Sequence, residues 1–483
     1  MKIFTSGQIA QIDKITLKSQ SISEYELIQR VADVLSRWLT HNIPLQNRRV
    51  LIFAGPGNNG KDAVALSSLL AEQKISCELF RINQMESISD IPQIDQNCLV
   101  IDGIFGTGLN RSPEGIYARV IKAINNSNAK VISIDIPGGL FSDTMTPDSN
   151  GTVVKADITL TLEFPKLAMF FKENSKFIGD WKVLDIGLDK YAKQNIETPY
   201  NVIDKEFVSS FIKRRLKNTH KGDYGHTLLI AGSYGMAGAA ILCSKGALRS
   251  GAGLVTLNVP EELYEIVQGS VPEAMCLTSI VADYDKFTTI AFGPGIGTSP
   301  ETVKRVSAIL KSCTKSMVID ADGLNIISAN REMLDLIPLN SVLTPHPKEF
   351  SRLAGELGDS AQALQMQLAF SLKYRVYVLL KGSNTSLSTP DGEIWFNVCG
   401  NPGMATGGSG DVLTGVIAAL MAQGYSPKES AISALFIHST AGDFAAKQFG
   451  EISMIAGDIV NNLGEAFKYV TDREEDKITV NNK

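Results

Sequence analysis

Short apolar runs that end in Gly or Asp recur along the first half of the chain. They are RRVLIFAG (48–55), NCLVIDGIFG (97–106) and AKVISIDIPGG (129–139), and helical patterns occupy 62–73 and 114–126 between them. Apolar strands that alternate with helices are typical of a parallel sheet with helices on both faces. The pattern predicts an α/β domain whose functional loops follow the carboxyl ends of the strands. Before it, residues 7–40 carry a helical pattern that is broken near Ser19–Ser23.

A second series of apolar runs begins after residue 220. It consists of 226–233, 253–260, 288–297, 316–325, 341–350 and 375–384, and STPDGEIWFN (388–397) adds a turn and an antiparallel strand. Pro-Asp-Gly favours a tight turn, which is why the last segment is predicted to reverse direction. The stretch 187–224 is more polar, so a domain boundary is expected near 205–215. We predict two α/β domains, 1–210 and 211–475, followed by a charged tail over 476–483.

Composition narrows the class of protein. With 483 residues, 44% of them hydrophobic and 20% charged, the chain is long enough for two or three globular domains. The net charge of −5 and the absence of a basic half argue against nucleic acid or a membrane surface as a partner. Six scattered cysteines and five scattered histidines offer no disulfide framework and no zinc motif. With no signal-like N-terminus and no long apolar run, we expect a cytoplasmic protein.

The stretch GNPGMATGGSGDVLTGVIAAL (400–420) is the richest in candidate chemistry. Glycine stands at five of the eleven positions from 400 to 410, and Asp411 then opens an apolar, helix-like run. Glycines let a backbone approach a ligand closely, and a helix N-terminus offers N–H groups that suit a phosphate. A carboxylate there would repel phosphate unless it takes a proton from a hydroxyl that reacts with a phosphoryl group. The alternative is a glycine-rich turn with Asp as a helix cap.

Further motifs follow other strands of the second half, and together they resemble a known family. They are KGDYGHTLLIAGS, the GAGLV that follows Ser250, GPGIG, DADGLN, LTPHPKEF and KGSNT, with NPGMATGGSGDVLTG after them. The region 215–470 resembles the ADP- or ATP-dependent NAD(P)H-hydrate dehydratases of the ribokinase-like superfamily. The resemblance implies a ribokinase-like α/β domain. It also implies that ADP is the co-substrate and that Mg²⁺ is the metal.

The resemblance assigns roles to individual residues of the second half. Asp411 is expected to accept the C6 hydroxyl proton of the hydrated nicotinamide while the terminal phosphoryl of ADP is transferred. Phosphate then leaves, and NAD(P)H is restored. Ala239, Gly295 and His346 are expected to bind the hydrate together with Asp411. The nucleotide is expected at Lys381, Gly382, Ser383, Asn384, Thr385 and Gly410, with Glu349 ordering water or Mg²⁺. Without the resemblance, His346 and Glu349 also fit an ordinary turn and helix start, and Asp320 and Asp322 fit helix caps.

In the first half, GPGNNGKD (55–62) almost matches the P-loop pattern but ends in Asp62, where that motif needs a hydroxyl for Mg²⁺. A P-loop is therefore rejected. The same stretch, with DGIFGTGLNR (102–111) and SIDIPGG (133–139), resembles the NAD(P)H-hydrate epimerase domain over about residues 1–205. This implies a Rossmann-like three-layer α/β/α domain that interconverts the R and S hydrates. Its hydrate site is expected at Asn58, Asn59, Gly60, Lys61 and Asp62, at Gly106, Thr107, Gly108, Leu109, Asn110, Arg111 and Ser112, and at Asp135, the catalytic carboxylate or an anchor.

The first half also departs from the epimerase pattern. A K⁺ ion is implied at Asn59, Asp102 and Gly138, yet Gly138 replaces a serine, and Lys61 and Ala63 replace glycines. Lys61 is then free to replace K⁺, to contact a dinucleotide phosphate, or to block the site. The capping of loops is an alternative role for Asp102 and Asp135.

The combined expectation is a bifunctional repair enzyme for NADHX and NADPHX, which uses ADP and forms a homo-oligomer. Two alternatives stay open. The second half also fits a small-molecule kinase, which would yield a stable phosphate ester. The first half also fits a binding module without catalysis, which the departures at Lys61 and Gly138 motivate.

Overall fold

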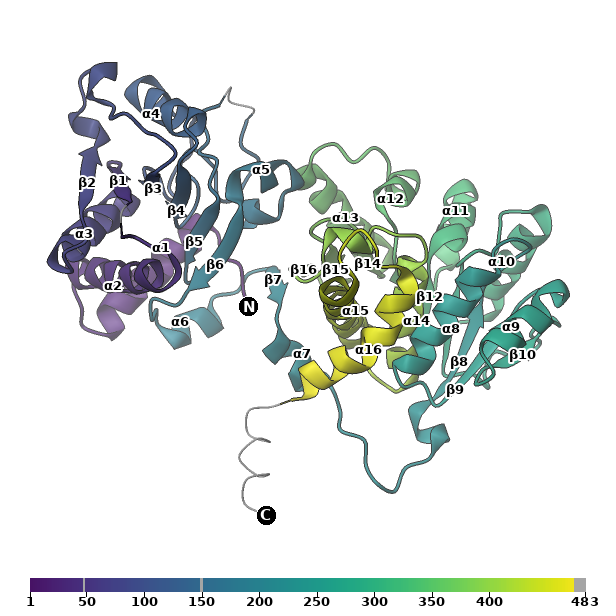
Figure 1. Cartoon of the computed structure of the whole chain (residues 1–483). Coiled ribbons are helices and arrows are strands. Elements are labelled where there is room, and N and C mark those ends of the chain that lie inside the picture. The colour runs from purple at the N-terminus through teal and green to yellow at the C-terminus, as the bar shows by residue number, and fades with distance from the viewer. Residues whose placement is uncertain (47, 148–150, 473–483) are drawn as a thin grey trace, which may run out of the picture. The chain divides into compact units, whose positions relative to one another are not determined.

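The computed structural model describes residues 1–46, 48–147 and 151–472, and it divides into two compact units (Figure 1). The N-terminal unit comprises Lys2–Tyr200 with Asp359–Ala361, and the C-terminal unit comprises Met1, Asn201–Gly358 and Gln362–Lys483. The predicted charged tail, 476–483, lies outside the described residues. Within the described part of the chain, no helix has the length and apolar character needed to span a bilayer.

The N-terminal unit is built on a parallel sheet with strand order β2-β1-β3-β4-β5-β6. The strands are β1 (Arg49–Ala54), β2 (Cys77–Arg81), β3 (Cys98–Gly103), β4 (Lys130–Ile134), β5 (Ile158–Leu162) and β6 (Asp180–Leu184). The helices are α1 (Ser6–Ser19), α2 (Glu24–Asn42), α3 (Asn58–Glu72), α4 (Gly115–Asn126), α5 (Ser175–Ile178) and α6 (Lys190–Asn195). The predicted break in the N-terminal helical pattern is confirmed, because α1 ends and α2 begins with a Ser23 cap inside it.

Both faces of this sheet are covered, as near-continuous apolar strands require. Val50 and Ile52 of β1 pack with Leu35 of α2 and Leu66 of α3. The alternate residues of β1, such as Leu51, pack with α4 on the other face. The three-layer α/β/α architecture predicted for the first half is therefore confirmed.

The C-terminal unit contains a ten-stranded sheet of order β10-β9-β8-β11-β12-β13-β14-β15-β16-β7. Its strands are β7 (Tyr200–Ile203), β8 (His226–Ile230), β9 (Leu254–Asn258), β10 (Met275–Leu277), β11 (Thr289–Phe292), β12 (Met317–Ile319), β13 (Val342–Leu343), β14 (Tyr377–Leu380), β15 (Ser386–Ser388) and β16 (Ile394–Asn397). The pairs from β10 to β14 are parallel, and β14-β15-β16 are antiparallel. The predicted turn before the antiparallel strand is confirmed by a Gly392 N–H that donates to Thr389 O at 3.1 Å.

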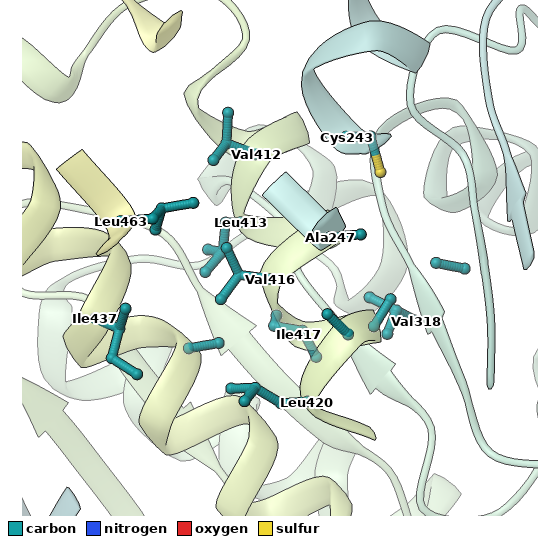
Figure 2. Close-up of a cluster of buried hydrophobic side chains, with 14 of the residues drawn as sticks. Cys243, Ala247, Val318, Val412, Leu413, Val416, Ile417, Leu420, Ile437 and Leu463 are labelled. Atoms are coloured by element: carbon teal, nitrogen blue, oxygen red, sulfur yellow. The ribbon is translucent and has the colours of Figure 1, made fainter. Parts of the chain in front are cut away.

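The helices of this unit are α7 (Lys205–Phe211), α8 (Ala237–Arg249), α9 (Tyr264–Ser270), α10 (Pro300–Ser312), α11 (Ala321–Ala329), α12 (Pro347–Ala354), α13 (Ser360–Tyr374), α14 (Ser409–Ala422), α15 (Pro427–Phe449) and α16 (Ala456–Thr471). Helix α14 is almost entirely buried, and its residues Val412, Val416 and Ile417 lie in one apolar cluster with Cys243 and Ala247 of α8 (Figure 2). This packing fixes the N-terminus of α14, the segment that carries the glycine-rich motif.

In each sheet, successive strands are added first on one side of a strand, β1 or β8, and then on its other side. This reversal marks where a ligand site is expected. In the N-terminal unit, β2 lies on one side of β1 and β3 on the other. In the C-terminal unit, β9 and β11 flank β8 in the same way. In open α/β sheets, ligands bind outside the carboxyl ends of the strands at such switch points.

Candidate active sites

The C-terminal unit has a cavity of about 890 Å³ at the carboxyl ends of its strands. Asp320 directly follows β12 and Lys381 directly follows β14, while His346 follows the end of β13 by three residues. The cavity is lined by seven residues of the predicted site, namely His346, Lys381, Gly382, Ser383, Thr385, Gly410 and Asp411, and by Glu349. Parallel strands bring their carboxyl ends to one edge of a sheet, which explains why residues so far apart in sequence meet here.

An ion pair between Lys381 and the buried Asp320 lines this cavity. Lys381 Nζ is 2.8 Å from Asp320 Oδ1, and the Asp320 side chain is only 2% exposed. The second oxygen of Asp320 accepts a hydrogen bond from Thr414 Oγ1 of α14 at 2.7 Å. The carboxylate of Asp320 therefore fixes the position of the Lys381 ammonium, and this role replaces the capping role considered for it from the sequence.

The glycines of the motif are required by close contacts. A Cβ on Gly410 would lie 3.0 Å from Lys381 Nζ, so the ammonium rests against the first turn of α14. Gly408 has φ of +92°, and a Cβ there would lie 2.4 Å from Leu242 Cδ1. Such a φ is unfavourable for any residue with a side chain. The N–H groups of a first helical turn, which lack partners within the helix, and the ammonium of Lys381 thus form a positive region suited to phosphate.

Asp411, at the third position of α14, has an unusual protonation equilibrium. Burial, together with the charges of Asp320 and Asp322 and against the opposing effect of Lys381, raises the pKa of Asp411 to about 6. A carboxylate with a pKa near 6 is ionised at neutral pH yet is a stronger base than an ordinary aspartate. The geometry therefore suits proton abstraction inside this cavity.

His346 and Glu349 have a structural role as well as a place in the cavity wall. His346 caps α12, since its Nδ1 accepts from the N–H groups of Lys348 at 3.1 Å and Glu349 at 3.3 Å. Glu349 Oε2 accepts from the His346 N–H at 2.8 Å in return. The turn and helix-start interpretation of these residues is therefore correct. Both also line the cavity, where Nε2 of His346 lies 3.4 Å from Oε1 of Glu349.

Ala239 and Gly295 meet each other outside the wall of this cavity. A Cβ on Gly295, where φ is +62°, would lie 3.0 Å from the Cβ of Ala239. Ala239 lies in the first turn of α8, which follows β8, and Gly295 lies in the loop after β11, the strand next to β8 in the sheet. The neighbouring Gly297 N–H donates to Asp322 Oδ2 at 2.9 Å, and the charge of Asp322 acts on Asp411. Asp322 thus links the loop that carries Gly295 to Asp411 of the cavity.

One cavity residue, His438, gave no signal in the sequence because it lies within the long helix α15. Its Nε2 lies 3.0 Å from the carbonyl oxygen of Ser409, the first residue of α14. Burial lowers the pKa of His438 to about 4, so the ring is neutral at physiological pH. His438 therefore helps to hold the start of α14 without adding charge to the cavity.

In the N-terminal unit, Asp135 forms the centre of the predicted site. It follows β4 with φ of +66°, a conformation that is rare for residues other than glycine. Its Oδ1 forms an ion pair with Lys166 Nζ and accepts from the Leu162 N–H at 3.1 Å. The Lys166 side chain is 1% exposed and also donates to Thr161 Oγ1 at 2.9 Å and Phe164 O at 2.8 Å. No motif in the sequence singles out Lys166.

Two more carboxyl groups belong to this cluster. Burial, and then the charge of Asp135, raise the pKa of Asp62 to about 8. The same causes raise the pKa of Asp13, which the sequence did not single out, to about 6. At neutral pH, Asp62 therefore carries a proton, whereas Asp135 is held as the anion of an ion pair. Two carboxyl groups in opposite protonation states are the arrangement that acid–base catalysis uses.

The residues predicted to bind a cation lie together behind this cluster. Asn59 Nδ2 donates to Phe105 O and Ile134 O at 2.9 Å each, while its Oδ1 is buried without a partner. Asp102 is fully buried; its Oδ2 accepts from Ser133 Oγ and the Gly138 N–H at 2.7 Å each. Burial raises the pKa of Asp102 above its ordinary value. Among the described residues, no three His, Cys, Asp or Glu side chains form a metal cluster.

The structure shows the surroundings of Gly138 and Lys61, two residues that depart from the epimerase pattern. A Cβ on Gly138 would lie 2.8 Å from Asp102 Oδ1, so a serine there would require a shift of the loop. Lys61 is half-exposed and pairs with Glu24 of α2 at 2.6 Å. Its ammonium therefore lies away from the buried Asn59 and Asp102, which argues against replacement of a cation by Lys61.

In the loop after β3, Phe105 and Gly106 lie against the same site, and Phe105 O accepts from Asn59 Nδ2. A Cβ on Gly106 would lie 3.3 Å from Asn59 Cβ and 4.0 Å from Asp135 Oδ2. Thr107 O accepts from Ser142 Oγ at 3.1 Å, whereas Gly108, Asn110 and Arg111 are exposed. Gly106 is thus placed beside the carboxyl cluster, and the rest of the predicted loop, with Leu109 and Ser112, stays a prediction.

Comparison with known proteins bears on both units. A family model described as NAD(P)H-hydrate dehydratase matches residues 227–464, and one described as YjeF-related protein N-terminus matches 24–93 and 78–168. The chain is 32% identical to the bifunctional NAD(P)H-hydrate repair enzyme Nnr of Moorella thermoacetica, over 98% of each chain.

Solved structures match the C-terminal half. The ADP/ATP-dependent NAD(P)H-hydrate dehydratase of Bacillus subtilis, co-crystallised with ATP and Mg²⁺, is 26% identical with a TM-score of 0.50, over 56% of this chain and 98% of that one. A ribokinase-like superfamily protein of Enterococcus faecalis is 26% identical with a TM-score of 0.52, over 57% and 99%. The ribokinase-like fold expected for the second half is therefore confirmed.

Proposed function

The chain belongs to the family of bifunctional NAD(P)H-hydrate repair enzymes, and we propose that its C-terminal unit dehydrates the S hydrate of NAD(P)H while its N-terminal unit interconverts the R and S hydrates. The observation that supports the first assignment most strongly is Asp411, a carboxyl group with a pKa of about 6 in the cavity that also holds Lys381 and the start of α14.

In the proposed dehydration, each group of the cavity has a defined role. Asp411 takes the proton of the C6 hydroxyl while that oxygen forms a bond to the terminal phosphorus of the nucleotide, whose bond to the leaving phosphate oxygen breaks. Lys381 and the N–H groups at Gly410 stabilise the charge on the transferring group. The C6–O bond then breaks with loss of phosphate, which is a far better leaving group than hydroxide. A C5 proton is lost as the ring double bond forms again.

We assign the nucleotide as ADP, which leaves as AMP, and place it at Lys381, Gly382, Ser383, Asn384, Thr385 and Gly410. The hydrate then lies between Asp411 and the pair Ala239 and Gly295, with His346 beside it. Carboxylate oxygens together with a polyphosphate form the ligand set that Mg²⁺ prefers, and Glu349 in the cavity wall fits it. Mg²⁺ there would neutralise charge on the phosphates.

For the epimerisation we assign Asp62 as the acid and Asp135 as the carboxylate that faces it. Asp62 donates its proton to the departing C6 hydroxyl, and the ring nitrogen lone pair forms an iminium ion as water leaves. The anionic Asp135, held by Lys166, stabilises that cation electrostatically. Water then adds to the opposite face of C6 and returns its proton to Asp62, which leaves the enzyme unchanged.

One atom among the residues implied for K⁺ suits a bound cation. Asn59 Oδ1 is a buried oxygen without a partner, and such an atom suits a cation that takes oxygen ligands. Asn59 and Asp102 would hold K⁺ there, with the backbone at Gly138 beside them, and the ion would add positive charge behind the hydrate site. A cytoplasmic location and a homo-oligomeric state remain predictions from the sequence.

These assignments are tested with pure S and pure R hydrates. The protein with ADP should convert the S hydrate to NAD(P)H, and Asp411→Asn should abolish this conversion while ADP still binds. Chromatography of the R hydrate without nucleotide should show interconversion in both proteins. A stable phosphate ester as the product with ADP would instead identify a small-molecule kinase.

A further inference from the structure

A second cavity, of about 500 Å³, lies in the N-terminal unit, and its lining includes no residue of the carboxyl cluster. It lies between α2, α3 and the ends of β1 and β2, and Tyr25, Ile28, Lys61, Val64 and Arg81 line it. On an α-helix, successive residues are 100° apart, so Lys61, Val64 and Ser68 share one face of α3 while Asn59 and Asp62 occupy the opposite one. The N-terminus of α3 therefore separates this cavity from the carboxyl cluster.

The strand order of the sheet indicates how one ligand would reach both the carboxyl cluster and this cavity. Asn59, Gly106 and Asp135 lie on the β3 and β4 side of the switch point, and the cavity lies on the β2 side. A dinucleotide with its hydrated ring at Asp135 would place its pyrophosphate at the N-terminus of α3, where N–H groups suit phosphate. Its adenosine half would then extend over β2, as in other open α/β sheets that bind dinucleotides.

The lining of the cavity fits an adenosine group. The Tyr25 side chain is 68% exposed at the mouth, where an adenine ring could stack on it. Ile28 and Val64 supply apolar walls, and Asn83, just beyond β2, supplies an amide. The shape and polarity of the wall therefore suit a purine better than a purely charged ligand.

Arg81 is the residue of this cavity that would distinguish a ribose 2′-phosphate from a 2′-hydroxyl. It is the last residue of β2 and pairs in register with Ala54, the last residue of β1, so it stands at the edge where the ligand would pass. Its exposed side chain makes no ion pair with any residue that the structure describes. In dinucleotide-binding folds, an acidic residue near this position selects the ribose 2′-hydroxyl, whereas an arginine accommodates a 2′-phosphate.

Charges around Arg81 are consistent with a phosphate there. Residues 81–83 read Arg-Ile-Asn, with no carboxylate at the end of β2. The one acidic residue lining the cavity, Glu72, is eleven residues from Lys61, which is about 16 Å along α3. Lys61 supplies a second cation, and its exposed pair with Glu24 is weak enough to be exchanged for a phosphate.

We propose that this cavity binds the adenosine half of the hydrated dinucleotide and that Arg81 binds its 2′-phosphate, so that the epimerase unit prefers NADPHX to NADHX. The identity of the substrate in this inference rests on the proposed epimerase function. The position of its adenosine half rests on the second cavity alone.

The test measures epimerisation of R-NADPHX and R-NADHX by chromatography, in an Asp411→Asn background that cannot dehydrate the product. We expect a higher kcat/KM for NADPHX. Arg81→Gln should lower kcat/KM for NADPHX about 10- to 100-fold through KM, and leave NADHX within about twofold. Arg119→Gln, an exposed arginine on α4 at the other face of the sheet, is the matched control and should change neither.

Equal losses for both substrates in Arg81→Gln, or no loss for either, would overturn the assignment of Arg81. A binding measurement separates this outcome from failure of the proposed function. If neither substrate is epimerised even with Arg81 present, the epimerase function fails; Arg81-dependent binding of 2′,5′-ADP in calorimetry would then still support the pocket. Loss of both the turnover and the Arg81-dependent binding would refute it.

Discussion

Replacing Asp411 by asparagine is predicted to stabilise the C-terminal unit while it abolishes dehydration. The pKa of Asp411 is raised from 3.8 to about 6, chiefly by burial. The folded chain therefore binds more protons than the unfolded chain between these two values. The stability associated with the protonated carboxyl is present below pH 4 and is lost as the pH rises through 6.

The size of the effect follows from the shift. Each pKa unit corresponds to 1.36 kcal/mol, so about two units give about 3 kcal/mol, and the partial solvent contact of the side chain makes this an upper bound. Asp411→Asn should therefore raise the free energy of unfolding by about 1–3 kcal/mol at pH 8 and leave it nearly unchanged at pH 4. Lys381 keeps its ion pair with Asp320 in the variant, so no buried charge is left alone.

Calorimetry at several pH values measures this, with the C-terminal unit identified as the transition that ADP shifts. Asp335→Asn, at an exposed carboxylate of the same unit, is the matched control and should change stability little at any pH. The reasoning is refuted if Asp411→Asn is no more stable than the parent at pH 8, or if its advantage is the same at pH 4.

Three further predictions concern other residues. Gly408→Ala should destabilise the C-terminal unit by about 2–4 kcal/mol, measured by denaturant unfolding, because its Cβ would lie 2.4 Å from Leu242 at a φ of +92°; a loss below 1 kcal/mol would contradict the close packing of this turn. Lys166→Met should reduce epimerisation at least about 100-fold in the R-hydrate assay while dehydration of the S hydrate continues, and normal epimerisation would remove Lys166 from the site. The rate of epimerisation should fall as the pH rises through about 8, where Asp62 loses its proton, and a rate that is constant from pH 7 to pH 10 would exclude Asp62 as the acid.

The sequence predicted the fold and the residues that follow strands. Lys381, His346 and Asp411 could be grouped in advance, because each follows a strand end or opens a glycine-rich helix, and the carboxyl ends of parallel strands meet at one edge. The three layers of the first half followed from its continuous apolar strands.

What could not be predicted depends on contacts between distant segments. Asp320 precedes a helix and reads as a cap, yet its carboxylate binds Lys381 and Thr414, sixty and more residues later. Lys166 follows Pro165 and precedes the apolar run 167–171, but no motif marks it as a site residue, and only the packing shows that its ammonium pairs with Asp135. The raised pKa values of Asp13 and Asp62 likewise arise from burial and from the charge of Asp135, which no local pattern encodes.

The central claim, two reactions in one chain, is tested most directly by one time course on mixed R and S hydrates of NADPH. The protein is added with ADP, and the recovery of reduced-nicotinamide absorbance is followed. Rapid recovery of the whole sample is predicted, because the R form is epimerised as the S form is consumed. Recovery of the S portion alone, followed by the slow spontaneous rate, would contradict the epimerase assignment, and no recovery at all would contradict both.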